Sequence, residues 1–159
     1  MLIEKPLLTL TNFAFIPAFL KFICSSSYLQ AMTLSFAAIA SMIYHSTEPM
    51  RNLPHFSNPL GGPPLLKLDQ FGAVIAMIAL ANGQMIKDYY FEIIILFVLM
   101  ITSDLVYLLP YSRQIKIVLR LLLHCPWHVG ALGYLPYIRA TNPEYQSNLF
   151  MNLFRLFFI

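Results

Sequence analysis

Two of the four histidines in the chain stand four positions apart near its end, as His124 and His128 in the segment HCPWH. Residues four apart share one face of a helix, so both imidazoles can reach a common point. Burying an imidazole in apolar surroundings costs free energy unless something binds it, and imidazole nitrogen is a common ligand of metal ions. The spacing therefore predicts a metal-binding pair, with hydrogen bonding between neighbouring helices as the alternative.

A second polar pair, Ser41 and His45, has the same spacing in the segment SMIYH, and Asp69 follows in LDQFGAV. Three imidazoles with an open fourth position are the ligand set of a catalytic zinc site, so we expect His45, His124 and His128 to be metal ligands. Ser41 and Asp69 are then the candidate catalytic residues, one bonding a reacting oxygen and the other orienting a ligand or carrying a proton. Each also has a plainer interpretation: His45 as an interfacial residue, Ser41 as bonded to its own helix, and Asp69 as a helix cap or the partner of a nearby lysine.

The composition indicates an integral membrane protein. Hydrophobic residues make up 58% of the 159 residues and charged residues only 11%, whereas a soluble domain carries about 25% charged residues. The net charge of +3 comes from scattered lysines and arginines, so no nucleic-acid partner is expected. At this length we expect a single transmembrane domain over residues 1–159.

Five apolar segments are long enough, or nearly so, to cross a bilayer core, which takes about 20 helical residues. They cover residues 7–24, 27–46, 65–86, 89–109 and 117–138. The expected fold class is therefore all-α, a polytopic membrane bundle of about five transmembrane helices. A loop rich in proline and glycine, 47–64, separates the second and third segments. The tail, 147–159, is too short to span and is expected to lie at the interface or against a partner protein.

The alternating direction of these spans brings the candidate residues to one side of the membrane. The second segment ends on the side where the third and fifth segments begin, so His45, Asp69 and His124 are expected at a similar depth. The second segment, 27–46, is also rich in alanine and serine, which favours close packing of its helix against neighbours. The pattern thus predicts a polar centre enclosed by closely packed helices.

Three other residues carry expectations about geometry. Pro17 interrupts the first apolar segment and should kink it, and Pro126 should bend the last helix between its two histidines. Asp104, near the end of the fourth segment, is expected to face water or to pair with a basic loop residue.

The segments SMIYH, LDQFGAV and HCPWH together resemble the CREST superfamily of membrane proteins. That group includes the alkaline ceramidases, the adiponectin and progestin receptors, and hydrolases that remodel GPI anchors. The resemblance implies a helix bundle with one zinc ion held by three histidines, here His45, His124 and His128. It implies Ser41 and Asp69 as the assisting residues. The family bundle has seven helices, so five spans predict a shortened version of it.

Three functions are compatible with these features. The first is zinc-dependent hydrolysis of an amide or ester bond in a membrane lipid. The second is a catalytically silent structural subunit of a larger membrane complex, such as a mitochondrial respiratory or ATP synthase assembly, with other subunits as partners. The third is a bis-histidine haem protein in which His45 faces His124 or His128. The expected location is the mitochondrial inner membrane or an endomembrane, with membrane lipids as partners.

Overall fold

A computed structural model describes residues 4–47 and 64–145, and every regular element within them is helical. The helices are α1 (Glu4–Thr11), α2 (Ile16–Cys24), α3 (Tyr28–Thr47), α4 (Pro64–Leu80), α5 (Gly83–Asp88), α6 (Tyr90–Leu105), α7 (Arg113–His128) and α8 (Leu135–Thr141). Shorter segments join them: η1 (Asn12–Phe15), η3 (Val106–Leu108) and η5 (Pro143–Tyr145) are 3-10 turns, and η4 (Val129–Tyr134) is π-helical. The all-α prediction is confirmed. Residues 48–63 of the predicted loop and the whole of the predicted tail, 147–159, lie outside the described residues.

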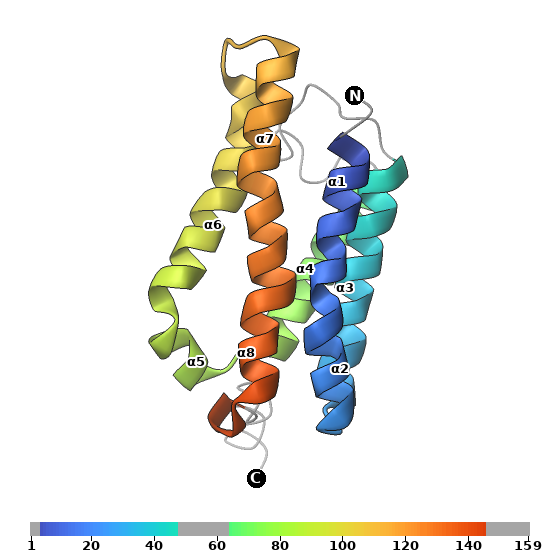
Figure 1. The fold of residues 1–159 in the computed structure, drawn as a ribbon, viewed down its shortest axis with the longest axis vertical. Helices are drawn as coiled ribbons and strands as arrows, with labels where there is room; N and C mark the ends of the chain where they lie inside the picture. The colour runs from blue at the N-terminus through green and yellow to red at the C-terminus, as the bar shows by residue number, and fades with distance from the viewer. Residues whose placement is uncertain (1–3, 48–63, 146–159) are drawn as a thin grey trace.

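The long helices form a bundle in which α3 is the centre of one half. It packs along α4 on one side and along the helix made by α1, η1 and α2 on the other. The second half is formed by α6 and α7, and the two halves meet where α7 packs against α1 and α8 against α2 (Figure 1). This arrangement brings α1, α3 and α7 together, although they are far apart in the sequence.

Each predicted segment coincides with a helical stretch, but the last stretch, Arg113–Thr141, extends beyond the predicted 117–138 at both ends, and the third is interrupted. The predicted segment 65–86 is continuous, whereas α4 ends at Leu80 and a separate short helix, α5, follows. Asn82 begins this new helix, because its side-chain carbonyl accepts a hydrogen bond from the backbone N–H of Met85 at 2.9 Å. Asparagine is among the best N-cap residues, so the prediction of one uninterrupted helix is wrong at this end.

Two prolines stand beside departures from regular α-helix. Pro17 lies in the first turn of α2, directly after the 3-10 turn η1 that interrupts the first long helix. A proline is tolerated at that position, since its missing N–H would have no partner within the helix. After Pro126, α7 continues to His128 and then changes to the π-helical η4, which ends just before Pro136. The irregular segment therefore lies after Pro126 rather than at it.

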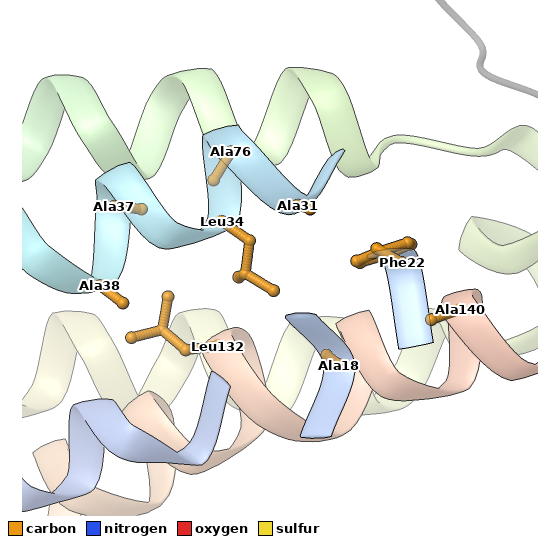
Figure 2. Close-up of a cluster of buried hydrophobic side chains, with 9 residues drawn as sticks. All are labelled: Ala18, Phe22, Ala31, Leu34, Ala37, Ala38, Ala76, Leu132 and Ala140. Carbon is orange, nitrogen blue, oxygen red and sulfur yellow. The ribbon is translucent and has the colours of Figure 1, made fainter. Parts of the chain in front are cut away.

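Alanine dominates the apolar core. The buried cluster consists of Ala18, Phe22, Ala31, Leu34, Ala37, Ala38, Ala76, Leu132 and Ala140 (Figure 2). Glycines extend this close packing: a Cβ added at Gly72 of α4 would lie 3.0 Å from the Cα of Ala37. One added at Gly133 would lie 2.8 Å from the backbone oxygen of Ala14. The predicted close packing of the segment 27–46 is confirmed by these contacts along α3.

Two helices in the described part of the chain are long and apolar enough to cross a membrane. They cover Pro6–Cys24, with 19 residues, and Arg113–Thr141, with 29. The other long helices, α3, α4 and α6, have 20, 17 and 16 residues. Membrane association is thus supported by the first and last helices, and the polytopic arrangement of five spans stays a prediction.

Candidate metal centre

Three buried imidazoles converge between α3 and α7. His45 lies in the last turn of α3, and His124 and His128 lie one turn apart on the face of α7 that points into the bundle. One ligand nitrogen from each ring lies within 4.8 Å of those of the other two. The ring centroids of His45 are 5.3 and 5.1 Å from those of His124 and His128. The predicted meeting of these three residues is confirmed, and their group could hold a metal ion.

Hydroxyl groups fix the orientation of two of the rings. Thr11 of α1 donates its hydroxyl proton to the backbone oxygen of Leu8 at 2.8 Å, and its Oγ1 is 3.2 Å from Nδ1 of His128. A hydroxyl has one proton to donate, so in this pair Thr11 accepts and the Nδ1–H of His128 donates. This bond makes Nε2 the lone-pair nitrogen of His128.

The same arrangement occurs at the second ring. Ser103 of α6 donates to the backbone oxygen of Met100 at 2.7 Å, and its Oγ is 3.0 Å from Nδ1 of His124. His124 therefore donates from Nδ1 and also carries its lone pair on Nε2. Metal-binding histidines almost always donate their second ring N–H to such an outer partner, which fixes the tautomer.

A small cation would have to bind the ring nitrogens that do not take part in the hydrogen bonds with Thr11 and Ser103. Nε2 of His45 and Nε2 of His124 are both buried. Three nitrogens bound to a tetrahedral zinc ion at 2.0–2.1 Å would lie about 3.3 Å from one another. The observed separations of up to 4.8 Å bring them within a small adjustment of that geometry. The donor set and its orientation fit a metal ion.

Ser41 and Asp69 lie beside this cluster. Ser41 is buried one turn before His45 on α3, and its hydroxyl donates a hydrogen bond to the carboxyl group of Asp69 on α4. The structure thus brings all five predicted site residues into one region, from three helices. Their roles as ligands and catalytic residues stay predictions.

A buried arginine adds charges that the sequence analysis missed. Arg120 is on the same face of α7 as His124, one turn before it, and is 3% exposed. Its guanidinium interacts electrostatically with Asp69 and with Asp104, which is buried on α6. The expectation that Asp104 faces water or pairs with a loop residue is wrong, because its partner is a buried arginine on the neighbouring helix. The regular spacing of Arg120, His124 and His128 was the signal that could have revealed this.

Thr11 and Ser103 were also missed. They come from α1 and α6, and neither helix carries one of the three clustered histidines. A lone threonine or serine in an apolar helix most often bonds its own backbone, which both residues also do here. Their second contacts depend on how distant helices pack, and no local pattern in the sequence predicts such contacts.

Comparisons of the chain with protein-family models, with curated proteins and with solved structures find no match. The geometry of the histidine cluster and the resemblance of its segments are therefore the available grounds for assigning a function.

Proposed function

We propose that this protein is a polytopic membrane protein that binds one zinc ion through His45, His124 and His128, and that it hydrolyses an amide or ester bond in a membrane lipid. The observation that carries the proposal is the convergence of three buried imidazoles. Two of them are oriented by hydroxyl groups, so that Nε2 is the nitrogen left for an ion. This arrangement of the three histidines favours binding of a metal ion over a role in packing alone.

The choice of zinc rests on the ligand set together with the resemblance to a known family. Three histidine nitrogens with an open fourth position form the ligand set of catalytic zinc, whereas closed structural sites have four protein ligands. Imidazole also binds copper, iron and nickel, so the ligand type alone does not select the metal. The resemblance of SMIYH, LDQFGAV and HCPWH to the CREST superfamily supports zinc.

The acidic and hydroxyl groups beside the cluster suit hydrolysis. Zinc with an open position lowers the pKa of water to about 7 and polarises a carbonyl group. In this proposal Asp69 accepts a proton from an attacking water and passes it to the leaving group. Ser41 holds the Asp69 carboxyl by its hydrogen bond, and Arg120 keeps a positive charge beside it. These contacts favour a single orientation of the carboxyl group.

A lipid substrate suits the surface of the bundle. Large apolar side chains are exposed on every long helix, for example Ile39 on α3, Phe71 on α4, Phe91 on α6 and Leu122 on α7. A soluble monomer rarely exposes apolar patches of this extent, whereas lipid chains would cover them. This surface supports embedding of all the long helices in a membrane, as the five predicted spans require.

The ring contacts disfavour the haem alternative. The centroids of the three rings are 4.5 to 5.3 Å apart, so no planar macrocycle fits between any two of them. The silent structural subunit would keep the same cluster and bind zinc without turnover. Only a measurement of activity separates it from the hydrolase.

The test combines metal content with lipid hydrolysis by the purified protein. We expect about one zinc per chain in the wild type and little in His45→Ala, while His55→Ala, a control at the remaining histidine, keeps its zinc. Asp69→Asn should retain zinc and lose hydrolysis of a fluorescent ceramide or ester lipid. Absence of zinc from the wild type would refute the proposal. Bound zinc without hydrolysis of any lipid tested would favour the silent subunit.

A further inference from the structure

Arg139 of α8 is a second buried arginine with surroundings unlike those of Arg120. It is 1% exposed and is the largest of the fully buried side chains among the described residues. Its Nη1 and Nη2 atoms are buried and have no hydrogen-bond partner in the part of the chain that the structure describes. The neighbouring Ala140 belongs to the same buried apolar cluster as Phe22 of α2 (Figure 2).

An enclosed guanidinium without an anion is unfavourable. A charge taken out of water must be compensated by an opposite charge and by hydrogen bonds, or an apolar residue of similar size is more stable in its place. A guanidinium offers five donors in a planar fork, which match the oxygens of a carboxylate or a phosphate group. The unmatched donors of Arg139 therefore indicate an anionic ligand.

The acidic residues at this end of the bundle do not supply that anion. Asp88 of α5 is exposed and already accepts hydrogen bonds from Gln84 at 2.9 Å and from the hydroxyl of Tyr145 at 2.7 Å. Glu144 is exposed as well. Since Nη1 and Nη2 of Arg139 have no hydrogen-bond partner among the described residues, their ligand must come from outside those residues.

The position of Arg139 favours a phosphate. α8 ends at Thr141, at the end of the bundle where α2 and α5 also lie (Figure 1). Exposed lysines, Lys21 and Lys87, stand in the last turns of α2 and α5. Each lysine directly follows an exposed apolar residue in the sequence, Leu20 before Lys21 and Ile86 before Lys87. Cations at helix ends next to an apolar surface are the usual setting of phospholipid headgroups.

We propose that Arg139 is the recognition residue of an anion site that takes a phosphate group, supplied by the headgroup of an anionic phospholipid at this end of the bundle. Arginine has a long flexible stem, so its guanidinium can turn from the protein interior toward the headgroup level while the stem stays buried. The site is separate from the histidine cluster and does not depend on the proposed hydrolysis.

The experiment uses the full chain, purified in a neutral detergent, and measures its melting temperature and its bound lipid by native mass spectrometry. Phosphatidylglycerol, phosphatidylcholine and inorganic phosphate are titrated separately. Arg139→Met removes the guanidinium with little change in volume, and Lys87→Met is the matched control at an exposed cation of the same end. The phosphatidylglycerol and phosphate titrations distinguish a lipid headgroup from free phosphate.

We expect phosphatidylglycerol to raise the melting temperature of the wild type by several degrees, with one tightly held lipid per chain. In Arg139→Met the apparent affinity for this lipid should fall at least tenfold, while Lys87→Met stays within about twofold of the wild type. Without anionic lipid, Arg139→Met should melt no lower than the wild type, because an uncompensated charge has been removed. A rise in melting temperature with inorganic phosphate but not with phosphatidylglycerol would support the phosphate site and identify free phosphate, not a lipid headgroup, as its ligand.

Two results would overturn the proposal. One is a wild type that neither retains phosphatidylglycerol nor responds to it or to phosphate, which is decisive even if the variant does not fold. The other is an equal response to phosphatidylglycerol in the wild type and in Arg139→Met.

Discussion

Helix α3 serves two buried regions of opposite character. Its first three turns contribute Ala31, Leu34, Ala37 and Ala38 to a core in which small side chains let the helix backbones approach closely. Its last turns contribute Ser41 and His45 to a polar centre in which the contacts are hydrogen bonds and charges. One helix therefore has to satisfy two different physical requirements along its length.

The alanine-rich core and the polar centre should tolerate different kinds of substitution. In the alanine-rich core, stability depends on volume, so an added methyl group is the damaging change. In the polar centre, stability depends on pairing, so removing one partner leaves another buried group unsatisfied. Substitutions in the two regions should therefore fail in different ways, and four of them measure the contrast.

The largest effect is expected from Asp104→Ala in the polar centre. It removes one of the two buried carboxyl groups that interact with Arg120, and breaking a buried ion pair from one side costs about 3–5 kcal/mol of unfolding free energy. Thermal unfolding in detergent gives the comparison, with Thr102→Ala, at an exposed neighbour on α6, as the control. Equal stability of the two variants would show that Arg120 and Asp104 do not depend on each other.

Two glycines of η4 test the effect of added volume where helices pack closely. A Cβ at Gly133 meets the backbone of Ala14, which cannot move without shifting the helix, so Gly133→Ala should cost about 1–3 kcal/mol. The three atoms nearest to a Cβ at Gly130 all belong to the side chain of Leu96, which can change its rotamer. Gly130→Ala should therefore be the milder change in the same unfolding assay. The reverse order would contradict the close approach of η1 and η4.

Ser103→Ala tests pairing around the histidines with a smaller effect on the fold. It removes the acceptor for Nδ1–H of His124, and loss of such an outer partner weakens metal binding about 10–100-fold. Zinc affinity is measured by competition with a chelating dye. Ser35→Ala on α3 is a matched control, since Ser35 bonds only its own helix backbone at Ala31. An unchanged affinity in Ser103→Ala would remove that serine from the centre.

The smallest effect is expected at the periphery, where Tyr145 donates to Asp88 at 2.7 Å. This hydrogen bond, with smaller contributions from burial and nearby charge, raises the pKa of Tyr145 to about 12, above the usual value of about 10. The neutral phenol is thus favoured by folding, so its contribution is complete below pH 10 and is lost as the pH rises through about 12. Tyr145→Phe should lower the melting temperature slightly at pH 8, and the difference should vanish above pH 12. A constant difference across this range would contradict the bond.

Much of the polar centre was predictable because its residues repeat at helical spacing. Ser41 and His45, like His124 and His128, are four apart, and the direction of successive helices was enough to bring Asp69 near them. The whole-helix pattern was predictable for the same reason, since the helices follow the apolar segments.

The remaining contacts depend on packing rather than on local pattern. Thr11 and Ser103 reach the histidines only because α1 and α6 pack against α7. Asp104 looked exposed in the sequence because its helix ends soon after it, yet α7 covers it with Arg120. The break at Asn82 was missed because the apolar residues continue past it, although the asparagine itself is a helix-start signal.

The central claim is that one zinc ion is held by imidazoles from α3 and α7. X-ray absorption spectroscopy of the purified full chain tests it most directly, because it counts the ligand atoms and measures their distances from the metal. We expect about one zinc ion per chain, coordinated by three histidine nitrogens and one oxygen at 2.0–2.1 Å. In any His45→Ala sample that still binds some zinc, we expect one nitrogen ligand fewer. A spectrum dominated by sulfur ligands, or protein without stoichiometric metal after zinc loading, would contradict it.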